Sequence, residues 1–230
     1  MILETEALAK RYRRRWALLD GTVSIPDGAI VGLVGPNGAG KSTFLQLIVG
    51  LLAPTGGTVR VLGGTPDAAM RSGRVGFVAQ DAPTYAGLTV ADHLQLGAGL
   101  NPHRWDAAAA RERTERLGLA PGQRAGRLSG GQRAQLALTI ALSKRPDLLV
   151  LDEPVAGLDP LARRAFLDET VAAATDAGSA VVLSTHLVAD LARTCTHVVV
   201  IAAGRVRLAE AITDPAGLER VVLDELGRAA

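Results

Sequence analysis

Two uninterrupted apolar runs, at residues 29–34 and 148–151, are the clearest feature in the pattern of hydrophobic and polar positions. Short apolar runs bounded by turn residues are typical of strands that are buried on both faces. Weaker strand patterns occur at residues 2–10, 21–25, 58–62, 74–79, 180–184, 197–202 and 205–209. We expect the last two strands to form a hairpin around Ala203 and Gly204.

Other segments have apolar residues at helical spacing. The clearest is residues 41–51, in which Phe44, Leu45, Ile48 and Leu51 fall on one face. The same period predicts helices at residues 90–96, 107–117, 132–142, 161–174 and 187–193. Strands and helices alternate in most of the chain, and this alternation predicts an α/β fold with a mostly parallel sheet.

Residues 83–142 break the alternation, because they contain only helical patterns joined by Gly- and Pro-rich segments. We therefore expect a single domain over residues 1–230, with a core of residues 1–82 and 143–230 and a helical insert at residues 83–142. A chain of 230 residues is long enough to bury a substantial core.

The composition is that of an ordinary globular protein, with 48% hydrophobic and 21% charged residues. The net charge of +2 gives no general attraction for nucleic acid, and the arginines at residues 11–15 are interpreted as a solvated turn. The single cysteine, Cys195, excludes an internal disulfide. The sequence has no secretory signal pattern, and no apolar run approaches the roughly 20 residues needed to span a bilayer, so we expect a cytoplasmic chain.

A glycine-rich loop directly follows the apolar run 29–34, in the order strand, loop, helix. It fits G-x-x-x-x-G-K-[ST], and its residues are Gly35, Pro36, Asn37, Gly38, Ala39, Gly40, Lys41, Ser42 and Thr43. The backbone N–H groups of such a loop surround phosphate oxygens, and Gly38 and Gly40 permit the close approach. Lys41 is expected to bridge the β- and γ-phosphates, and Ser42 to ligate Mg²⁺. The loop predicts nucleotide binding.

Two carboxylates end the apolar run 148–151, at the sheet edge where ligands bind in such folds. Asp152 suits the coordination of Mg²⁺. Glu153 is the candidate general base, which accepts a proton from the water that attacks the γ-phosphate. Acidic residues also follow strands simply because turns are solvated. The catalytic interpretation of this pair therefore depends on the phosphate loop expected beside it.

A second segment of small residues precedes the predicted helix 132–142, and it reads Leu128, Ser129, Gly130, Gly131 and Gln132. A helix N-terminus of this kind can also face an anion. With this segment included, the chain resembles the nucleotide-binding domain of ATP-binding cassette (ABC) transporters over essentially its whole length. The family's order also includes Gln80 after a strand, Gly157-Leu158-Asp159 after the carboxylate pair, and His186 after a further strand.

The resemblance implies a P-loop NTPase (RecA-like) core with a mostly parallel sheet, an N-terminal antiparallel β portion and an inserted α-helical subdomain. It implies that Tyr12 stacks on adenine, that Gln80 contacts Mg²⁺ or the attacking water, and that His186 touches the γ-phosphate. Trp16 is a rival platform for adenine that spacing alone does not exclude.

By the same resemblance, the catalytic site is completed by a second nucleotide-binding domain. Asp159 would help to couple the two sites of the dimer. The signature residues would act in trans on the ATP that Lys41 of the other domain holds, and they are Ser129, Gly130, Gly131 and Gln132. The sequence leaves open whether the dimer is a homodimer or a heterodimer.

An ATP-hydrolysing subunit of this type would lie on the cytoplasmic face of the membrane, beneath separately encoded transmembrane permease subunits. Residues 50–57 and the compact C-terminus resemble the exporter type found in drug or antibiotic efflux systems, whereas importer ATPases often carry a longer C-terminal extension. The alternative is a soluble ABC-type ATPase that acts on DNA or ribosomes. The second cassette, coiled coil or zinc-binding cysteines that are usual in such proteins do not occur here.

Two groups of residues lie outside the family pattern. Less frequent residues occupy four positions on the helix behind the signature, and they are Ala134, Gln135, Thr139 and Ile140. Their effect on ATP turnover is left open by the sequence. His93, His103 and His197 are spaced without a metal-binding pattern, so they are interpreted as structural or solvent-exposed residues, and no zinc is expected.

Overall fold

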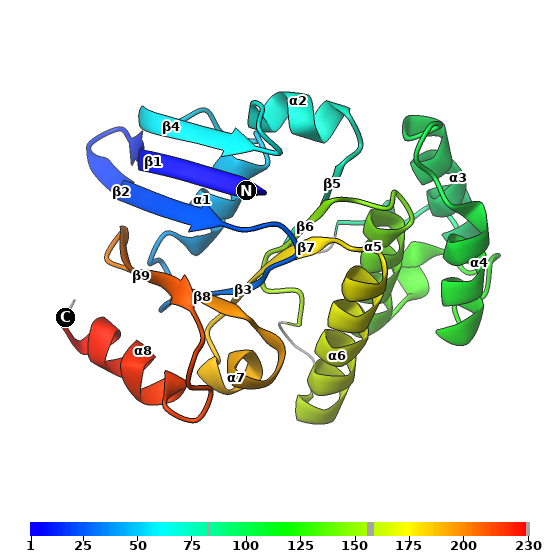
Figure 1. Cartoon of the computed structure of the whole chain (residues 1–230). Coiled ribbons are helices and arrows are strands. Elements are labelled where there is room, and N and C mark those ends of the chain that lie inside the picture. The colour runs from blue at the N-terminus through cyan, green and yellow to red at the C-terminus, as the bar shows by residue number, and fades with distance from the viewer. Residues whose placement is uncertain (82, 156–158, 229–230) are drawn as a thin grey trace.

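The computed structural model describes residues 1–81, 83–155 and 159–228. A six-stranded sheet lies at its centre (Figure 1). Its strands, in spatial order, are β5 (Val75–Val78), β6 (Leu148–Leu151), β7 (Ala180–Thr185), β3 (Ile30–Val34), β8 (His197–Ala202) and β9 (Arg205–Ala211). Neighbouring strands are parallel except for the β8–β9 hairpin. The predicted α/β fold and the predicted closing hairpin are therefore confirmed.

A second sheet is antiparallel and has the order β2-β1-β4, formed by β1 (Leu3–Tyr12), β2 (Arg15–Ile25) and β4 (Gly56–Val61). β2 begins at Arg15, well before the predicted residue 21, and the turn is reduced to residues 13 and 14. Arg13 adopts a left-handed backbone there, with φ of 52°. The short turn places Tyr12 opposite Arg15, and Arg11 opposite Trp16, on paired strands.

Helix α1 (Lys41–Ile48) lies between the two sheets in Figure 1. Its side chains Phe44, Leu45, Leu47 and Ile48 are fully buried in a cluster that includes residues of both sheets. Burial of each such side chain contributes about 1.5–3 kcal/mol. The helix ends at Ile48, earlier than predicted, because Gly50 takes a positive φ of 76°. Its buried face fixes the place of the loop that precedes it.

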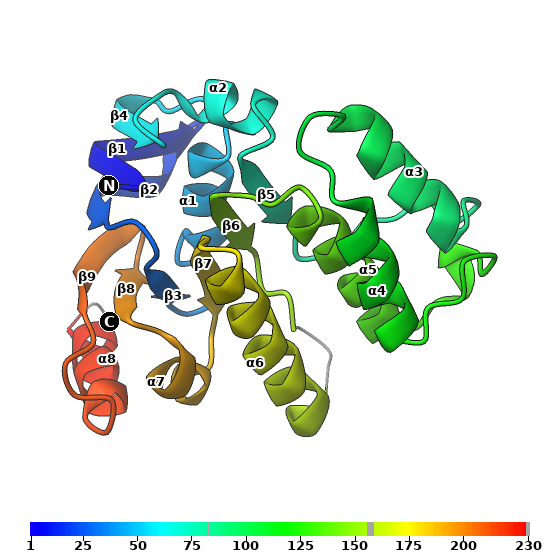
Figure 2. The ribbon, with the colours of Figure 1, turned by 45° about the vertical axis from the view of Figure 1, so that its right-hand side comes forward.

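The helical insert contains α3 (Val90–Leu100), α4 (Ala107–Arg116), the short 3₁₀ helix η1 (Ala125–Arg127) and α5 (Gly130–Leu142). Figure 2 shows α3 and α4 standing to one side of the sheets. Helix α5 belongs to both parts, because Leu136 packs in the small core of the insert while Leu138 packs in the main core. In the main core it lies with Phe166 of α6 (Pro160–Asp176).

The remaining helices differ from the prediction, and most of them are short. The predicted helix 187–193 is divided into the 3₁₀ helix η2 (Val188–Asp190) and α7 (Leu191–Thr194). Helices α2 (Pro66–Arg71) and α8 (Leu218–Gly227) were not predicted, and α2 is too short to show a period. Among the described residues, every helix is too short or too polar to cross a lipid bilayer.

Candidate functional site

A cavity of about 750 Å³ opens between the two sheets. Five pieces of the chain line it: the β1–β2 turn, the phosphate loop with the start of α1, the end of β5, the end of β6, and the tip of the β8–β9 hairpin. The parallel strands β3, β5 and β6 all point their carboxyl ends toward this place, as ligand sites in open α/β sheets require.

The phosphate loop reaches the cavity in a shape that depends on its glycines. A Cβ on Gly35 would lie 2.0 Å from the carbonyl oxygen of Ile201, and a Cβ on Gly40 would lie 2.5 Å from that of Ala17. Gly40 is also left-handed, with φ of 112°, and it precedes α1 without any side-chain cap. The first N–H groups of α1 therefore keep their hydrogen-bonding capacity for an anion in the cavity.

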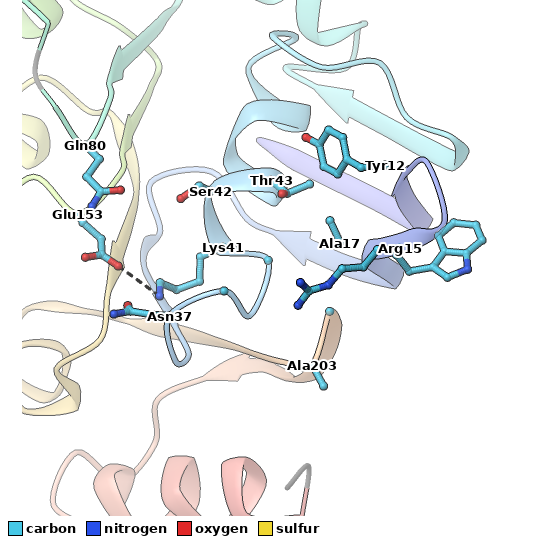
Figure 3. A pocket seen from close by; sticks show the side chains of 14 residues that line it. Tyr12, Arg15, Ala17, Asn37, Lys41, Ser42, Thr43, Gln80, Glu153 and Ala203 are labelled. Carbon is cyan, nitrogen blue, oxygen red and sulfur yellow. Dashed lines mark ion pairs between the residues drawn. The ribbon is translucent and has the colours of Figure 1, made fainter.

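Lys41 is the buried cation of this loop, with only 5% of its side chain exposed. Its Nζ donates to the carbonyl oxygens of Gly35 at 2.8 Å and of Pro36 at 3.3 Å. It also lies 3.2 Å from Oε1 of Glu153, the ion pair drawn in Figure 3. The structure thus joins the phosphate loop to the end of β6, residues far apart in the sequence.

The carboxylate pair at the end of β6 is held by a serine on the neighbouring strand β7. The hydroxyl of Ser184 donates to Oδ1 of the buried Asp152 at 2.8 Å, and Oγ of Ser184 in turn accepts the N–H of Glu153 at 2.8 Å. Glu153 takes a left-handed φ of 43°, which is strained for a residue with a side chain. Oε2 of Glu153 lies 3.4 Å from Nδ1 of His186. Glu153 therefore lies between Lys41 and His186.

Two of the three residues expected around Mg²⁺, Ser42 and Gln80, line the same cavity, whereas the third, Asp152, is buried next to the lining residue Glu153. Ser42 and Thr43 lie at the start of α1, and Gln80 follows β5. Figure 3 shows Gln80 beside Glu153, across the cavity from Ser42. Asp152 lies immediately before Glu153 and is 4% exposed. Asn37 also lines the cavity.

Both aromatic candidates line the cavity, so the choice between them stays open. Tyr12 is 45% exposed and Trp16 is 43% exposed. Each has a cation near its ring, with Nζ of Lys10 5.5 Å from the Tyr12 centroid and the guanidinium of Arg11 5.3 Å from Trp16. An exposed aromatic ring beside a phosphate loop offers a surface on which a base can stack.

Besides Ala17, which lines the cavity, sequence reasoning missed four residues of the site. Arg15 extends toward the cavity in Figure 3, and Ala203 lines its edge. Gly204 donates to the carbonyl of Ala39 in the phosphate loop at 2.9 Å, so the β8–β9 hairpin holds this loop. The fourth residue is Ser184. Of these residues, only Ala203 and Gly204 could have been found from the sequence, through the turn predicted there. The positions of Arg15 and Ser184 depend on how the strands pair, which the sequence pattern does not show.

The signature segment lies outside the cavity of its own chain. Ser129 caps α5, its hydroxyl accepting the N–H of Gln132 while the Gln132 side chain accepts the N–H of Ser129. A Cβ on Gly130 would meet nothing within 4 Å. Gly131 is partly exposed at the same helix start. The role in trans stays a prediction.

Asp159 is a helix cap as well. Its carboxylate accepts the N–H groups of Leu161 and Ala162, each at 3.0 Å, at the start of α6. Gly157 and Leu158 of the same motif lie outside the described residues. Asp159 is exposed and does not line the cavity, so its proposed part in coupling two sites is not tested by one chain.

The residues that depart from the family pattern pack behind the signature. Ala134 and Thr139 are buried, and Ile140 packs against the core of the insert. Gln135 accepts a hydrogen bond from the guanidinium of Arg113 at 3.0 Å. These side chains support α5 and do not line the cavity.

Comparison with known proteins gives consistent matches. The model of the family described as "ABC transporter" matches residues 18–156. The daunorubicin/doxorubicin resistance ATP-binding protein DrrA of Streptomyces peucetius is 38% identical over 92% of this chain and 65% of the relative's length. The sulfate/thiosulfate import ATP-binding protein CysA 2 of Chromobacterium violaceum is 36% identical over 89% of this chain and 57% of the relative. The chain thus spans about two thirds or less of these relatives.

A solved ATP-binding subunit of an ABC transporter superposes with a TM-score of 0.82 and 27% identity, over 99% of this chain and 98% of that one. This agreement supports the P-loop NTPase architecture predicted above, including the antiparallel sheet and the helical insert.

Proposed function

The chain belongs to the ABC transporter family, and from this premise we propose that it binds and hydrolyses ATP to power a transporter. The observation that carries the proposal is the cavity in which the uncapped start of α1 and the buried Lys41 face Glu153. A buried cation, free backbone N–H groups and a carboxylate in one cavity are the parts that phosphoryl transfer to water needs.

The residues of the cavity fit ATP with Mg²⁺. The first turn of α1 would cradle the phosphates, and Tyr12 or Trp16 would stack on the base. Oxygen atoms of Ser42, Gln80 and Asp152 are the hard ligands that Mg²⁺ prefers, and these residues would hold it. When bound, Mg²⁺ supplies charge neutralisation for the phosphate oxygens. Asp152 is preset for this role because Ser184 fixes its carboxylate.

Glu153 is the proposed general base. Its carboxylate is positioned on one side by Lys41 and on the other by His186, at 3.2 Å and 3.4 Å. When ATP binds, Lys41 would turn from Glu153 to the phosphates, because a charge-assisted contact to phosphate replaces the pair with the carboxylate. Glu153 would then accept the proton of the attacking water, and His186 would donate to the γ-phosphate.

We further propose that two such domains close on ATP, with Ser129 and its neighbours completing the site of the partner. The exposed start of α5, already capped by Ser129 and Gln132, supports this, since it does not line the cavity that contains Lys41. Transmembrane permease subunits would anchor the pair on the cytoplasmic face. Export is proposed because the relative DrrA is named for drug resistance, although a relative named for import also matches. The comparisons give no support to an ATPase acting on DNA or ribosomes.

The experiment measures phosphate release by the purified chain with ATP and Mg²⁺, for the native protein and for Glu153→Gln. We expect hydrolysis to fall by about 10²–10⁴-fold in the variant, the usual contribution of a general base. ATP binding should persist, because the amide leaves Lys41 free for phosphate, and the variant should elute as a dimer in gel filtration with ATP. Glu115→Gln, on the exposed face of α4, is the control. Hydrolysis equal to that of the native protein in Glu153→Gln would remove Glu153 from this role.

A further inference from the structure

His93 lies close to two segments that neighbour residues of the proposed reaction, residues 85–89, which come a few positions after Gln80, and residues 124–128, which precede Ser129. It is carried by α3, in the insert, and is 5% exposed. The sequence predicted only that it is structural or exposed. The structure buries it, and a buried imidazole needs partners for its ring nitrogens.

Both ring nitrogens of His93 have a backbone partner. Nδ1 lies 2.7 Å from the carbonyl oxygen of Thr89, one turn earlier in the chain. Because a carbonyl only accepts, Nδ1 carries the proton, and Nε2 is left as an acceptor. The N–H of Tyr85 donates to this Nε2 at 3.1 Å. The ring centroids of Tyr85 and His93 lie 6.1 Å apart, with an angle of 31° between the ring planes. His93 therefore ties the backbone at Tyr85 to α3.

The residues that follow Tyr85 pair with the segment that leads to the signature. The carbonyl of Ala86 accepts the N–H of Gly126 at 3.1 Å, and the carbonyl of Leu88 accepts the N–H of Ala125 at 2.9 Å. Thr89 and Arg124 form an antiparallel bridge next to them. The pairing ends only three residues before Ser129.

Apolar packing supports the same connection. Leu128, the first residue of the signature, is 3% exposed and lies in one cluster with Val90 and Leu136. Leu94, the residue after His93, packs against this cluster. The start of α3, the strip 85–89 and the segment before Ser129 thus form one packed unit.

We propose that His93 is a positioning residue for ATP hydrolysis. Through Nε2 it holds Tyr85, five residues after Gln80, on α3, so that residues 85–89 stay paired with the segment that presents Ser129. A shift of the segment near the cavity would then be accompanied by a shift of the signature segment, which contacts the second domain. This inference rests on the proposed function, since Gln80 and Ser129 matter only if ATP is hydrolysed at the joined sites.

Three substitutions of His93 separate its two contacts. His93→Ala removes both. His93→Asn keeps a short polar group near the position of Nδ1 and loses the acceptor for Tyr85. His93→Gln is longer, and its amide oxygen reaches the position of Nε2, so the acceptor for Tyr85 is kept. His103→Ala, on the exposed surface of the same insert, is the matched control.

Two readouts are measured on the full chain, amide hydrogen exchange without ATP and steady-state ATP hydrolysis. In His93→Ala and His93→Asn, exchange at Tyr85, Ala125 and Gly126 should speed up about tenfold, the effect of one lost hydrogen bond to a buried partner. kcat should fall about tenfold, with KM for ATP within about twofold, because a misplaced catalytic group slows the reaction step. His93→Gln should restore both readouts, and His103→Ala should alter neither.

The outcomes distinguish this inference from the proposed function. A native protein that releases no phosphate with ATP and Mg²⁺ would contradict the proposed function. A native protein that hydrolyses ATP, combined with normal kcat in His93→Ala, would overturn the role of His93. Equal losses in His93→Gln and His93→Asn, together with a lower melting temperature in both, would reduce His93 to a structural residue and also overturn the proposal.

Discussion

The phosphate loop and the signature segment are both small-residue loops at the start of a helix, yet their surroundings differ. At the start of α1 no side chain caps the helix, and the free N–H groups line a cavity of about 750 Å³. At the start of α5, Ser129 and Gln132 cap each other's backbone, and the segment is exposed. The N–H groups of the first helix start are therefore available to a ligand in the cavity, whereas those of the second are capped by its own side chains and its surface is open to another molecule.

Two glycines should show this difference most strongly. Gly35→Ala would place a Cβ 2.0 Å from the backbone oxygen of Ile201, and Gly130→Ala would place one in open space. We expect Gly35→Ala to destabilise the chain by about 2–3 kcal/mol, because backbone must shift, and Gly130→Ala by no more than about 0.5 kcal/mol. Chemical denaturation measures both values.

The Gly130→Ala variant has a second use. Its ATP hydrolysis should fall although its stability is unchanged, because the added methyl group faces the expected partner domain. Normal hydrolysis at normal stability would show that this face of α5 makes no close contact during turnover.

Substitution of two serines, one at the start of each helix, tests the difference in capping between α1 and α5. Ser129→Ala removes the side chain that caps α5 and should cost about 1 kcal/mol, a fall in melting temperature of about 2–4 °C for a chain of this size. Ser42→Ala removes no cap from α1 and should leave the melting temperature without nucleotide nearly unchanged. With ATP and Mg²⁺ added, the native protein should be stabilised more than Ser42→Ala, as thermal unfolding would show. A larger loss of stability in Ser42→Ala than in Ser129→Ala without nucleotide would contradict the comparison.

The smallest expected effect is a change of stability with pH. Helices α3 and α5 both begin with a capping box, but the third residue of the helix is Asp92 in α3 and Gln132 in α5. In α3 the N–H and hydroxyl of Thr89 donate to Asp92, and the hydrogen bond from the N–H is the main cause that lowers the pKa of Asp92 below its ordinary value. A lowered pKa means that the carboxylate stabilises the fold above about pH 4, and that this contribution is lost as the pH falls through the folded pKa. The cap of α5 uses Gln132, which does not titrate.

The measurement compares melting temperatures between pH 7 and acid. The difference between the native protein and Asp92→Asn should be present at neutral pH and should shrink below about pH 4. The difference in melting temperature between the native protein and Gln132→Ala should not shrink in this way, because the amide of Gln132 does not titrate. A constant difference for Asp92→Asn across this range would show that the charge of Asp92 does not stabilise α3.

Much of the site could be predicted because its motifs are local. Gly40, Lys41 and Glu153 were assigned from short patterns, and all three line one cavity in the structure. That the carboxylate pair and the phosphate loop share one site followed from the rule that parallel strands end at one edge, whereas the ion pair between Lys41 and Glu153 was found only in the structure. Arg15 was missed because the turn before β2 was expected to be longer.

The sequence by itself determined most of the strands and longer helices, the phosphate loop and the carboxylate pair, since these depend on residue type and on spacing over a few positions. Only the tertiary structure decided that Ser184 orients Asp152, that the β8–β9 hairpin holds the phosphate loop, and that His93 joins Tyr85 to α3. The first two contacts join residues far apart in the chain, through strand register and the approach of separate elements. The third depends on the path of the loop before α3, which hydrophobic periodicity does not encode.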